Sequence, residues 1–398
     1  MILDKLFLGS KYFFAILIFF ANLWIVNIVN TADFGELSFY RLSLQYLQYA
    51  ELGLLQYVFR SLSAEEKIYR SDVNNIVSVL LISVLSFFSL YSLVGYEYSF
   101  FTDNRFILIL LFAVFFGFIT KHSIDKLRIE NNTKMIVLLE FISMCLLFIG
   151  IGFSLNSNNK LFWIIITYGV YQIPYSIYFF LFLYRGVFFK FNLRIKKDVL
   201  NDSIMLALFA FFSLLFFSVD RLIIKFYWGF QDLGLYAFPL TVVNGAFIVL
   251  QSILWLNMPN FIHSIKNSSD KTKTRMEFKT YRKKLLIIYG VLFLFGAVCY
   301  KILITFFLEK YESTFTTFIL LFVFYLFSLL YIYEQNYLIV YKKYKILVLS
   351  FLSIAVLNFS INYFLSIYHK VELLIFVSII CHLLVWLFLK FKVNKCII

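Results

Sequence analysis

The chain has 398 residues, of which 62% are apolar, 22% are aromatic and only 15% carry a charge. A soluble domain has about 45–50% apolar and about 25% charged residues, so this composition excludes disorder, collagen and disulfide scaffolds and disfavours a water-soluble globule. The net charge of +14 would also suit a nucleic-acid-binding protein, but the positions of the basic residues explain it differently.

Long apolar segments recur along the whole chain. A helix needs about 20 largely apolar residues to cross the hydrocarbon core of a bilayer, and continuous runs of this length indicate helices rather than barrel strands. Six segments carry no formal charge: 12–32, 73–96, 161–184, 233–263, 313–333 and 346–369. Six others are shorter or contain ionisable residues: 36–58, 106–120, 135–153, 203–219, 285–308 and 373–389. The sequence therefore predicts an all-α polytopic membrane protein with twelve transmembrane helices.

The loops between these segments alternate in basic charge. If the end that carries Lys5 and Lys11 is inside, 28 Lys and Arg residues lie inside and 7 lie outside. This asymmetry follows the positive-inside rule and supports the count of twelve, because one missed helix would invert every later loop. Both termini are therefore expected in the cytoplasm. The basic charge is explained by topology and anionic lipid, and no nucleic-acid partner is expected.

The segments also indicate two halves. Six precede the loop 185–200 and six follow it, so we expect lobes at 1–190 and 191–398, related as a parallel repeat. The stretch DFGEL at 33–37 matches DLGLY at 232–236 at the equivalent position of the second half.

Features of an enzyme are missing from the sequence. The expected outer loops are short, and no Walker A loop, dinucleotide fingerprint, H-E-x-x-H motif or nucleophile elbow occurs. The four His and the four Cys are scattered, without the spacing of a metal site. We therefore expect a protein that is not an enzyme and that has no cofactor or metal.

Four short motifs resemble the polysaccharide-repeat flippases of the multidrug/oligosaccharidyl-lipid/polysaccharide exporter superfamily. They are DFGEL at 33–37, ELGL at 51–54, FSVDRLII at 217–224 and DLGLY at 232–236. The resemblance implies two six-helix lobes that form a V around a central cavity in the bacterial inner membrane. It also implies undecaprenyl-diphosphate-linked oligosaccharide repeat units, of the O-antigen or capsule type, as the cargo, and other polysaccharide assembly proteins as partners.

Such a cargo sets physical requirements. A charged diphosphate and a sugar cannot cross hydrocarbon without polar partners, so the carrier needs a wet, partly cationic lumen that opens alternately to each side. Because no ATP motif is present, an ion gradient or cargo supply must drive transport.

The second segment is the richest in polar residues that could line this lumen. Arg41, Gln45 and Gln48 lie on one helical face, Glu51 lies at its edge, and Gln56 continues it. In the eighth segment, Asn244 and Gln251 form a similar polar face. The alternatives are an Arg41 that pairs with an acid or reaches the interface, and interhelical hydrogen bonds for Asn244 and Gln251.

Five further ionisable residues are candidates for other roles. Asp220, Arg221 and Lys225 would make gate or lobe contacts near the outer face, or else form ordinary interfacial charges. Glu140 and Glu334 are candidates for coupling to a proton or sodium ion, although Lys134 and Lys342 are close enough to pair with them. The basic residues of 266–284 are expected in a solvated cytoplasmic loop, and His382 in a structural role.

These observations favour a flippase for lipid-linked oligosaccharide that works by alternating access. One alternative is a multidrug or cation exporter of the same superfamily, which would be expected to have a more acidic cavity. A membrane-embedded polysaccharide polymerase or ligase is the other alternative, and the short outer loops disfavour it.

Overall fold

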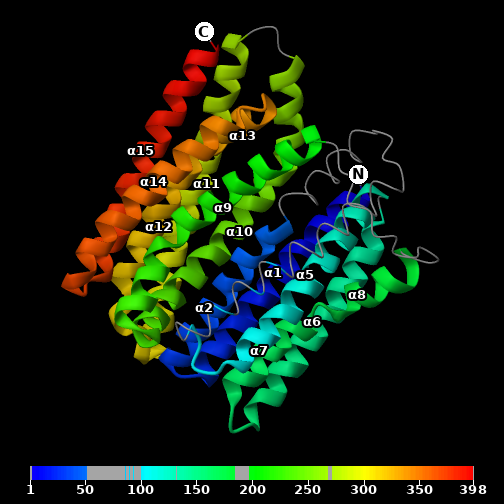
Figure 1. Ribbon diagram of the computed structural model, residues 1–398, viewed down its shortest axis with the longest axis vertical. Helices are drawn as coiled ribbons and strands as arrows, with labels where there is room; N and C mark the ends of the chain where they lie inside the picture. Colours follow the sequence, from blue (N-terminus) through cyan, green and yellow to red (C-terminus); the bar gives the residue numbers. More distant parts are fainter. Residues whose placement is uncertain are drawn as a thin grey trace. The chain divides into compact units, whose positions relative to one another are not determined.

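The computed structural model describes residues 2–51, 86, 89, 93, 100–130, 132–183, 197–267 and 271–397. Every regular element within these ranges is helical (Figure 1). The contacts divide the chain into two compact units, Met1–Phe211 and Phe212–Ile398. The lobe boundary expected between residues 190 and 191 falls in the range 184–196, which lies outside the described residues.

In the first unit, helices that are far apart in the sequence pack against one another. α1 packs against α6, α6 against α7, and α5 against α2, α7 and α8. The bounds are α1 Ile2–Ile28, α2 Thr31–Leu47, η1 Gln48–Glu51, α5 Arg105–Ile129, α6 Thr133–Leu155, α7 Lys160–Val170, α8 Ile173–Tyr178 and η2 Phe179–Leu183.

Asparagine side chains cap three helices of this unit. Asn30, Asn132 and Asn159 each accept a hydrogen bond from a backbone N–H in the first turn of α2, α6 and α7, respectively. Such caps satisfy amide groups that have no partner inside the helix. They mark where the helices begin: α2 starts at Thr31, inside the apolar segment 12–32, whereas α6 and α7 start just before their apolar segments.

The second unit starts within α9 and ends with α15, the last helix of the chain. α15 packs against α12 and α14, and α10 packs against α11 and α12. The bounds are α9 Lys197–Ile223, η3 Ile224–Trp228, α10 Phe230–Asn267, α11 Lys271–Phe306, η4 Glu309–Thr314, α12 Phe315–Leu330, α13 Ile332–Val340, α14 Tyr344–Leu365, η5 Ser366–Tyr368 and α15 Val371–Ile397.

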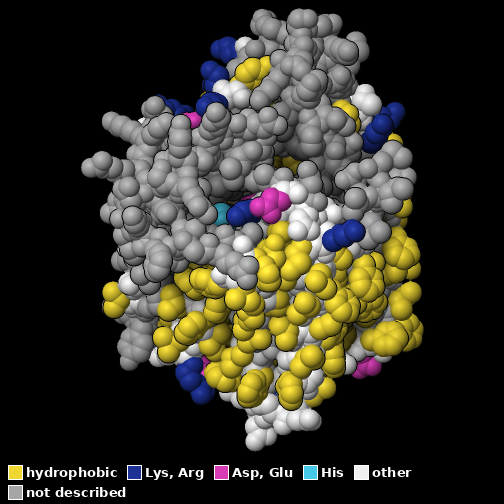
Figure 2. All heavy atoms as spheres, turned by 90° about the vertical axis from the view of Figure 1, so that its right-hand side faces the viewer, with side chains coloured by type: hydrophobic (Ala, Val, Ile, Leu, Met, Phe, Trp, Pro, Cys, Tyr) yellow, Lys and Arg dark blue, Asp and Glu magenta, His cyan; other side chains and the backbone are white. Residues whose placement is uncertain are grey.

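The described helices are long and apolar enough for a multi-pass membrane protein. Eight of them could cross a bilayer by length and composition, and Phe13–Ile28 is a shorter apolar stretch. Many large apolar side chains on these helices are exposed, such as Phe112, Phe141 and Phe153. Figure 2 shows apolar side chains over a broad part of one face, with few charged ones among them. A surface of this kind suits contact with lipid rather than with water.

Several predicted boundaries are wrong, chiefly because polar residues continue helices beyond the apolar runs. The expected second helix 36–58 begins earlier, at Thr31, and its α-helical part ends at Leu47. The seventh helix, expected at 203–219, runs from Lys197 to Ile223 and continues as a π-helical turn to Trp228. Asp220, Arg221 and Lys225 therefore lie inside helical structure and not beyond its end.

The expected cytoplasmic loop 266–284 is also corrected. α10 continues to Asn267 and α11 begins at Lys271, so most of these basic residues are helical. The tenth apolar run is divided, since α12 ends at Leu330 and α13 begins at Ile332. Of the expected third span, 73–96, all residues except 86, 89 and 93 lie outside the described residues.

Candidate functional site

A small polar cluster surrounds Arg41 in the first unit. Its guanidinium donates hydrogen bonds to Asn22 Oδ1 of α1, at 2.6 Å, and to the Tyr168 hydroxyl of α7. The guanidinium carbon also lies 4.5 Å from the centre of the Tyr168 ring, within the range of a cation–π contact. We call Asn22, Arg41 and Tyr168 the Arg41 cluster. Within the described ranges no carboxylate forms an ion pair with Arg41, so the groups that contact its positive charge there are neutral.

The amides that follow Arg41 on the chain are accessible. The side chains of Gln45 and Gln48 are exposed, whereas the side chain of Glu51 and the whole of Gln56 lie outside the described residues. Gly117 of α5 leaves space for the side-chain amide of Gln172, because a Cβ at position 117 would lie 3.0 Å from Gln172 Oε1. The polar face predicted for the second helix is thus present in part, with Arg41 tethered by its neighbours and two glutamines exposed.

In the second unit, four helices converge on the carboxylate of Asp220. Oδ1 accepts hydrogen bonds from Ser378 Oγ of α15 at 2.7 Å and from Asn362 Nδ2 of α14 at 3.2 Å. Oδ2 accepts one from the Tyr236 hydroxyl of α10 at 3.3 Å. Asn358 completes the group, since its Oδ1 lies 3.0 Å from Asn362 Nδ2 and 3.1 Å from Ser378 Oγ. All five residues of this Asp220 cluster are buried.

The amide nitrogen of Asn362 occupies an unusual position in this cluster. Four oxygens lie 3.0 to 3.4 Å from it: Asp220 Oδ1, Asn358 Oδ1, Ser378 Oγ and the Leu374 carbonyl. An amide nitrogen has only two hydrogens to donate. The buried Asn362 Oδ1, by contrast, has no hydrogen-bond partner among the described residues. If the Asn362 amide were rotated by about 180°, its Oδ1 would take the place of Nδ2 and lie next to these four oxygens.

A buried, oxygen-rich cluster with one formal negative charge suits a hard monovalent cation or a proton. Hard cations select carboxylate, carbonyl and hydroxyl oxygens, and a buried carboxylate gains from neutralisation. The described residues contain no group of three or more His, Cys, Asp and Glu that could hold a metal ion. The oxygen atoms of the Asp220 cluster therefore suit a singly charged ion better than a zinc ion.

The two glutamates expected to couple an ion lie elsewhere. Glu334 of α13 is buried and forms an ion pair with Arg282 of α11 rather than with Lys342. Glu140 of α6 is half-buried. Because Glu334 already has a cationic partner, Asp220 is the better candidate for an exchangeable cation.

Among the described residues, Asn244 and Lys225 make contacts with aromatic side chains outside the Asp220 cluster. Asn244 Oδ1 accepts a hydrogen bond from the Tyr325 hydroxyl at 2.6 Å, which joins α10 to α12. The Lys225 ammonium lies 4.3 Å from the centre of the Phe226 ring. Arg221 is half-buried, and the side chain of Gln251 lies outside the described part of the chain.

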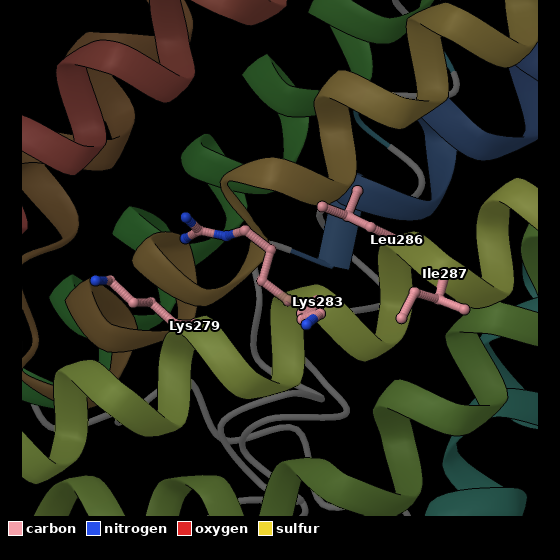
Figure 3. Close-up of a pocket in the computed structure, with 5 residues that line it drawn as sticks. Lys279, Lys283, Leu286 and Ile287 are labelled. Carbon is pink, nitrogen blue, oxygen red and sulfur yellow. The ribbon is translucent and has the colours of Figure 1, made fainter.

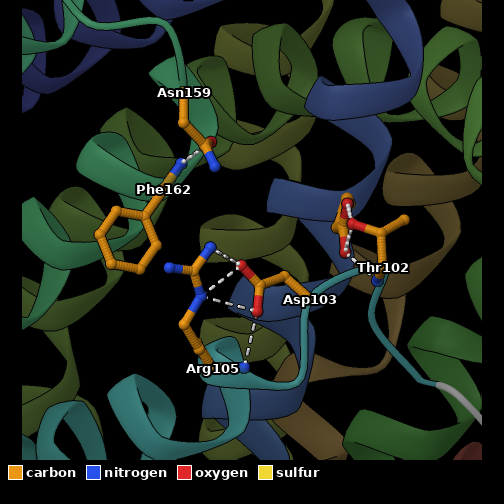
Figure 4. A network of polar contacts seen from close by, with 6 residues as sticks. Thr102, Asp103, Arg105, Asn159 and Phe162 are labelled. Carbon is orange, nitrogen blue, oxygen red and sulfur yellow. Dashed lines mark hydrogen bonds and ion pairs between the residues drawn. The ribbon is translucent and has the colours of Figure 1, made fainter.

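Sequence reasoning missed Asn358, Asn362 and Ser378. The available signal was a pair of amides four residues apart in an otherwise apolar span, followed by a serine in the next span. It also missed Glu36, a buried carboxylate that accepts hydrogen bonds from the Thr102 backbone and hydroxyl at 2.6 Å each (Figure 4). In the predicted scheme Glu36 was only part of a repeated motif.

Comparisons with known proteins bear on the fold. No family model and no curated protein sequence matches the chain. Solved structures do match. A MATE protein in the straight conformation is 11% identical, with a TM-score of 0.66, over 98% of this chain and 94% of that chain. An outward-facing multidrug resistance MATE family transporter of the MOP superfamily is 12% identical, with a TM-score of 0.65, over 99% and 93%. Its inward-facing counterpart is 10% identical, with a TM-score of 0.64, over 97% and 94%.

This likeness extends over nearly the whole chain at low sequence identity, so it concerns the fold. It confirms the predicted fold class, an all-α membrane fold with the twelve-helix topology of these transporters.

Proposed function

We propose that this chain is a secondary transporter in which the Asp220 cluster binds the coupling ion. The observation that carries the proposal is the burial of one carboxylate that accepts hydrogen bonds from three side chains on three other helices. No nucleotide-binding motif occurs in the sequence, so ion movement or cargo supply is the available source of free energy. One charge that crosses a potential of 100 mV contributes about 2.3 kcal/mol.

The cluster connects ion occupancy to helix packing. Its members belong to α9, α10, α14 and α15. When neither a cation nor a proton is bound, the buried carboxylate is stabilised only by neutral donors, the hydroxyls of Ser378 and Tyr236 and the amide of Asn362. A bound cation or proton removes that charge and competes with the amide. Because a ligand shifts a conformational equilibrium only by its difference in affinity for the two states, the ion must bind better to one packing of these helices.

The cargo has two candidates, and the comparisons support the exporter alternative better than the flippase. The matched transporters are described as multidrug resistance proteins of the MATE family. Export of small amphiphilic molecules is therefore the first candidate for this chain.

A specific observation favours the second candidate, a flippase for undecaprenyl-diphosphate-linked oligosaccharide in the bacterial inner membrane. Among the described residues Arg41 has only neutral partners, and it is followed by the exposed Gln45 on α2 and the exposed Gln48 at the start of η1. A cation without an acid attracts phosphate, whereas a cationic drug would be repelled. Amide groups next to it can bind sugar hydroxyls.

One experiment separates the candidates. Purified protein in liposomes is given a cationic dye in one arm and a short-chain prenyl-diphosphate oligosaccharide in the other, with and without a sodium or proton gradient. A flippase moves only the second cargo, and Arg41→Gln reduces that movement at least tenfold. An exporter moves the dye, and Arg41→Gln leaves dye export unchanged or faster. Arg105→Gln is the control for loss of a cation, and failure to move either cargo rejects both candidates.

A further inference from the structure

α11 changes character along its length. Its first part, Lys271–Lys284, is rich in Lys and Arg, and the rest, from Leu285 to Phe306, contains only one basic residue, Lys301. On the apolar part, one face is strongly exposed, at 58% to 69% of each side chain, and this face consists of Ile287, Val291, Leu294, Phe295 and Val298. A helix face of this kind in a membrane protein contacts acyl chains.

A hollow of about 360 Å³ lies where the two parts meet, and it is lined by Lys279, Arg282, Lys283, Leu286 and Ile287. Figure 3 shows Lys279 and Lys283 on the turns that precede Ile287. Residues 279, 283 and 287 are four apart, so they share one helical face. The basic wall of the hollow therefore continues directly into the exposed apolar face.

The charges of the hollow are not balanced within the second unit as the structure describes it. Arg282 is paired with Glu334 of α13, which fixes the guanidinium at the wall of the hollow. Lys279 is exposed and so is Lys283, and neither forms an ion pair with a described residue. Three cations and one carboxylate leave an excess of two positive charges.

We propose that this hollow binds the headgroup of an anionic phospholipid in the leaflet that faces the basic loops. The phosphate would be held by Lys279 and Lys283, with Arg282 as a fixed third donor, and the glycerol would lie against Leu286. The acyl chains would then follow Ile287 along the exposed face of α11. A free phosphate would use only the basic wall, whereas a phospholipid also covers the apolar one. This site is separate from the Asp220 cluster and does not depend on which cargo is carried.

The test measures lipid binding to the full-length purified protein by native mass spectrometry, with dioleoyl-phosphatidylglycerol or dioleoyl-phosphatidylcholine as the probe. We expect tighter binding of phosphatidylglycerol, and a ten- to thirtyfold weaker affinity in Lys279→Gln/Lys283→Gln, because each basic residue contributes about 1 kcal/mol toward anionic lipid. Lys279→Arg/Lys283→Arg should retain the binding. Lys392→Gln/Lys395→Gln, on α15 of the same unit, is the matched control and should lose less than threefold.

A phosphatidylglycerol analogue with a photoreactive group near the headgroup provides a second readout that does not depend on protein yield. Its crosslinks should map to residues 279–287. Equal affinity for the two lipids, equal losses in the two Gln variants, or crosslinks elsewhere would overturn the site. Displacement by inorganic phosphate or by prenyl diphosphate at tenfold lower concentration than phosphatidylglycerol would assign the hollow to another phosphate compound.

Discussion

Asp220 Oδ1 and Ser378 Oγ lie 2.7 Å apart, although 158 residues separate them in the chain. This hydrogen bond joins the first helix of the second unit to the last one, at the centre of the Asp220 cluster. The cluster is therefore a property of the folded unit and of no single helix.

Asp220→Asn should abolish coupling to the ion without unfolding the protein. The amide keeps the size of the carboxylate but has no charge to be neutralised, and a neutral group is easier to bury. In the wild-type protein, sodium at a hundred times its Kd should raise the free energy of unfolding by about 2.7 kcal/mol, and Tm should rise with it. Thermal unfolding with and without sodium, and at several pH values to detect a proton, measures the effect.

Asp232→Asn is the control for this variant, because Asp232 lies in the first turn of α10 and outside the cluster. It should keep the response to the ion. If Asp220→Asn responds to sodium and to pH as the wild-type protein does, the ion does not bind at the cluster.

Breaking the ion pair between Arg282 and Glu334 from one side should destabilise the second unit. Glu334→Gln leaves the guanidinium without its partner in a largely buried place, where removal of one member costs about 3–5 kcal/mol. The side chains are 17% and 8% exposed, so screening by water reduces this toward the lower end. The measurement is Tm of the purified protein. Arg282→Met/Glu334→Leu should recover most of the loss, and a double variant as unstable as the single one would contradict the pairing.

Gly150→Ala should weaken the packing of α6 against α7. A Cβ at Gly150 would lie 2.2 Å from Thr167 Oγ1 and 2.5 Å from Thr167 Cγ2. The threonine cannot turn away freely, because its hydroxyl donates to the Trp163 carbonyl at 2.7 Å. Overpacking of this kind costs about 1–3 kcal/mol, which a lower Tm would report.

Gly152→Ala is the matched control on the same helix, since nothing lies within 4 Å of its added Cβ. Alanine there should be neutral or stabilising, because it favours helix more than glycine does. Equal effects of the two substitutions would show that helix propensity, and not contact with Thr167, sets the stability.

The pair of Asp103 and Arg105, just before and at the start of α5, predicts a small pH dependence. The carboxylate accepts hydrogen bonds from the Arg105 side chain at 2.8 Å and from its backbone N–H at 2.9 Å (Figure 4). The side-chain hydrogen bond from Arg105 is the main cause that lowers the pKa of Asp103 below its ordinary value of 3.8. A lowered folded pKa means that the stabilisation is present above that ordinary value and is lost as the pH falls through the folded pKa.

Thermal unfolding of the wild-type protein and Asp103→Asn between pH 7 and pH 3 checks this sign. The small advantage of the wild-type protein at pH 7 should shrink as the pH falls below about 4. Because the pair is exposed, 0.5 M salt should also reduce it. An advantage that persists at pH 3 would assign it to another interaction.

The sequence predicted the fold class because apolar length and basic asymmetry are sufficient to locate membrane helices. It placed helix ends less well. Asn30 caps α2 inside the expected segment 12–32, Asn159 caps α7 just before the segment 161–184, and Asp220 lies within α9, beyond the expected end at residue 219. The contacts between side chains on different helices were the least predictable. Arg282 was assigned to a loop, and its contact with Glu334 depends on how α11 packs near α13, which no local pattern determines.

Only some residues of the candidate site could be identified from the sequence. Arg41 stood out because a charge in an apolar span is rare. The neutral Asn358 and Asn362 did not, because single amides are common in membrane helices and become informative only when Asp220 lies beside them.

The Asp220 cluster has a consequence for biosynthesis. Asp220 emerges from the ribosome long before Asn362 and Ser378, which belong to the last two membrane helices. Until α15 is inserted, the carboxylate lacks the hydroxyl that lies 2.7 Å from it in the finished protein. A chain truncated after α14 keeps the donors Tyr236 and Asn362 but lacks the hydroxyl of Ser378, so its buried acid is less well satisfied, and membrane proteases that recognise such defects should degrade it faster than the full chain.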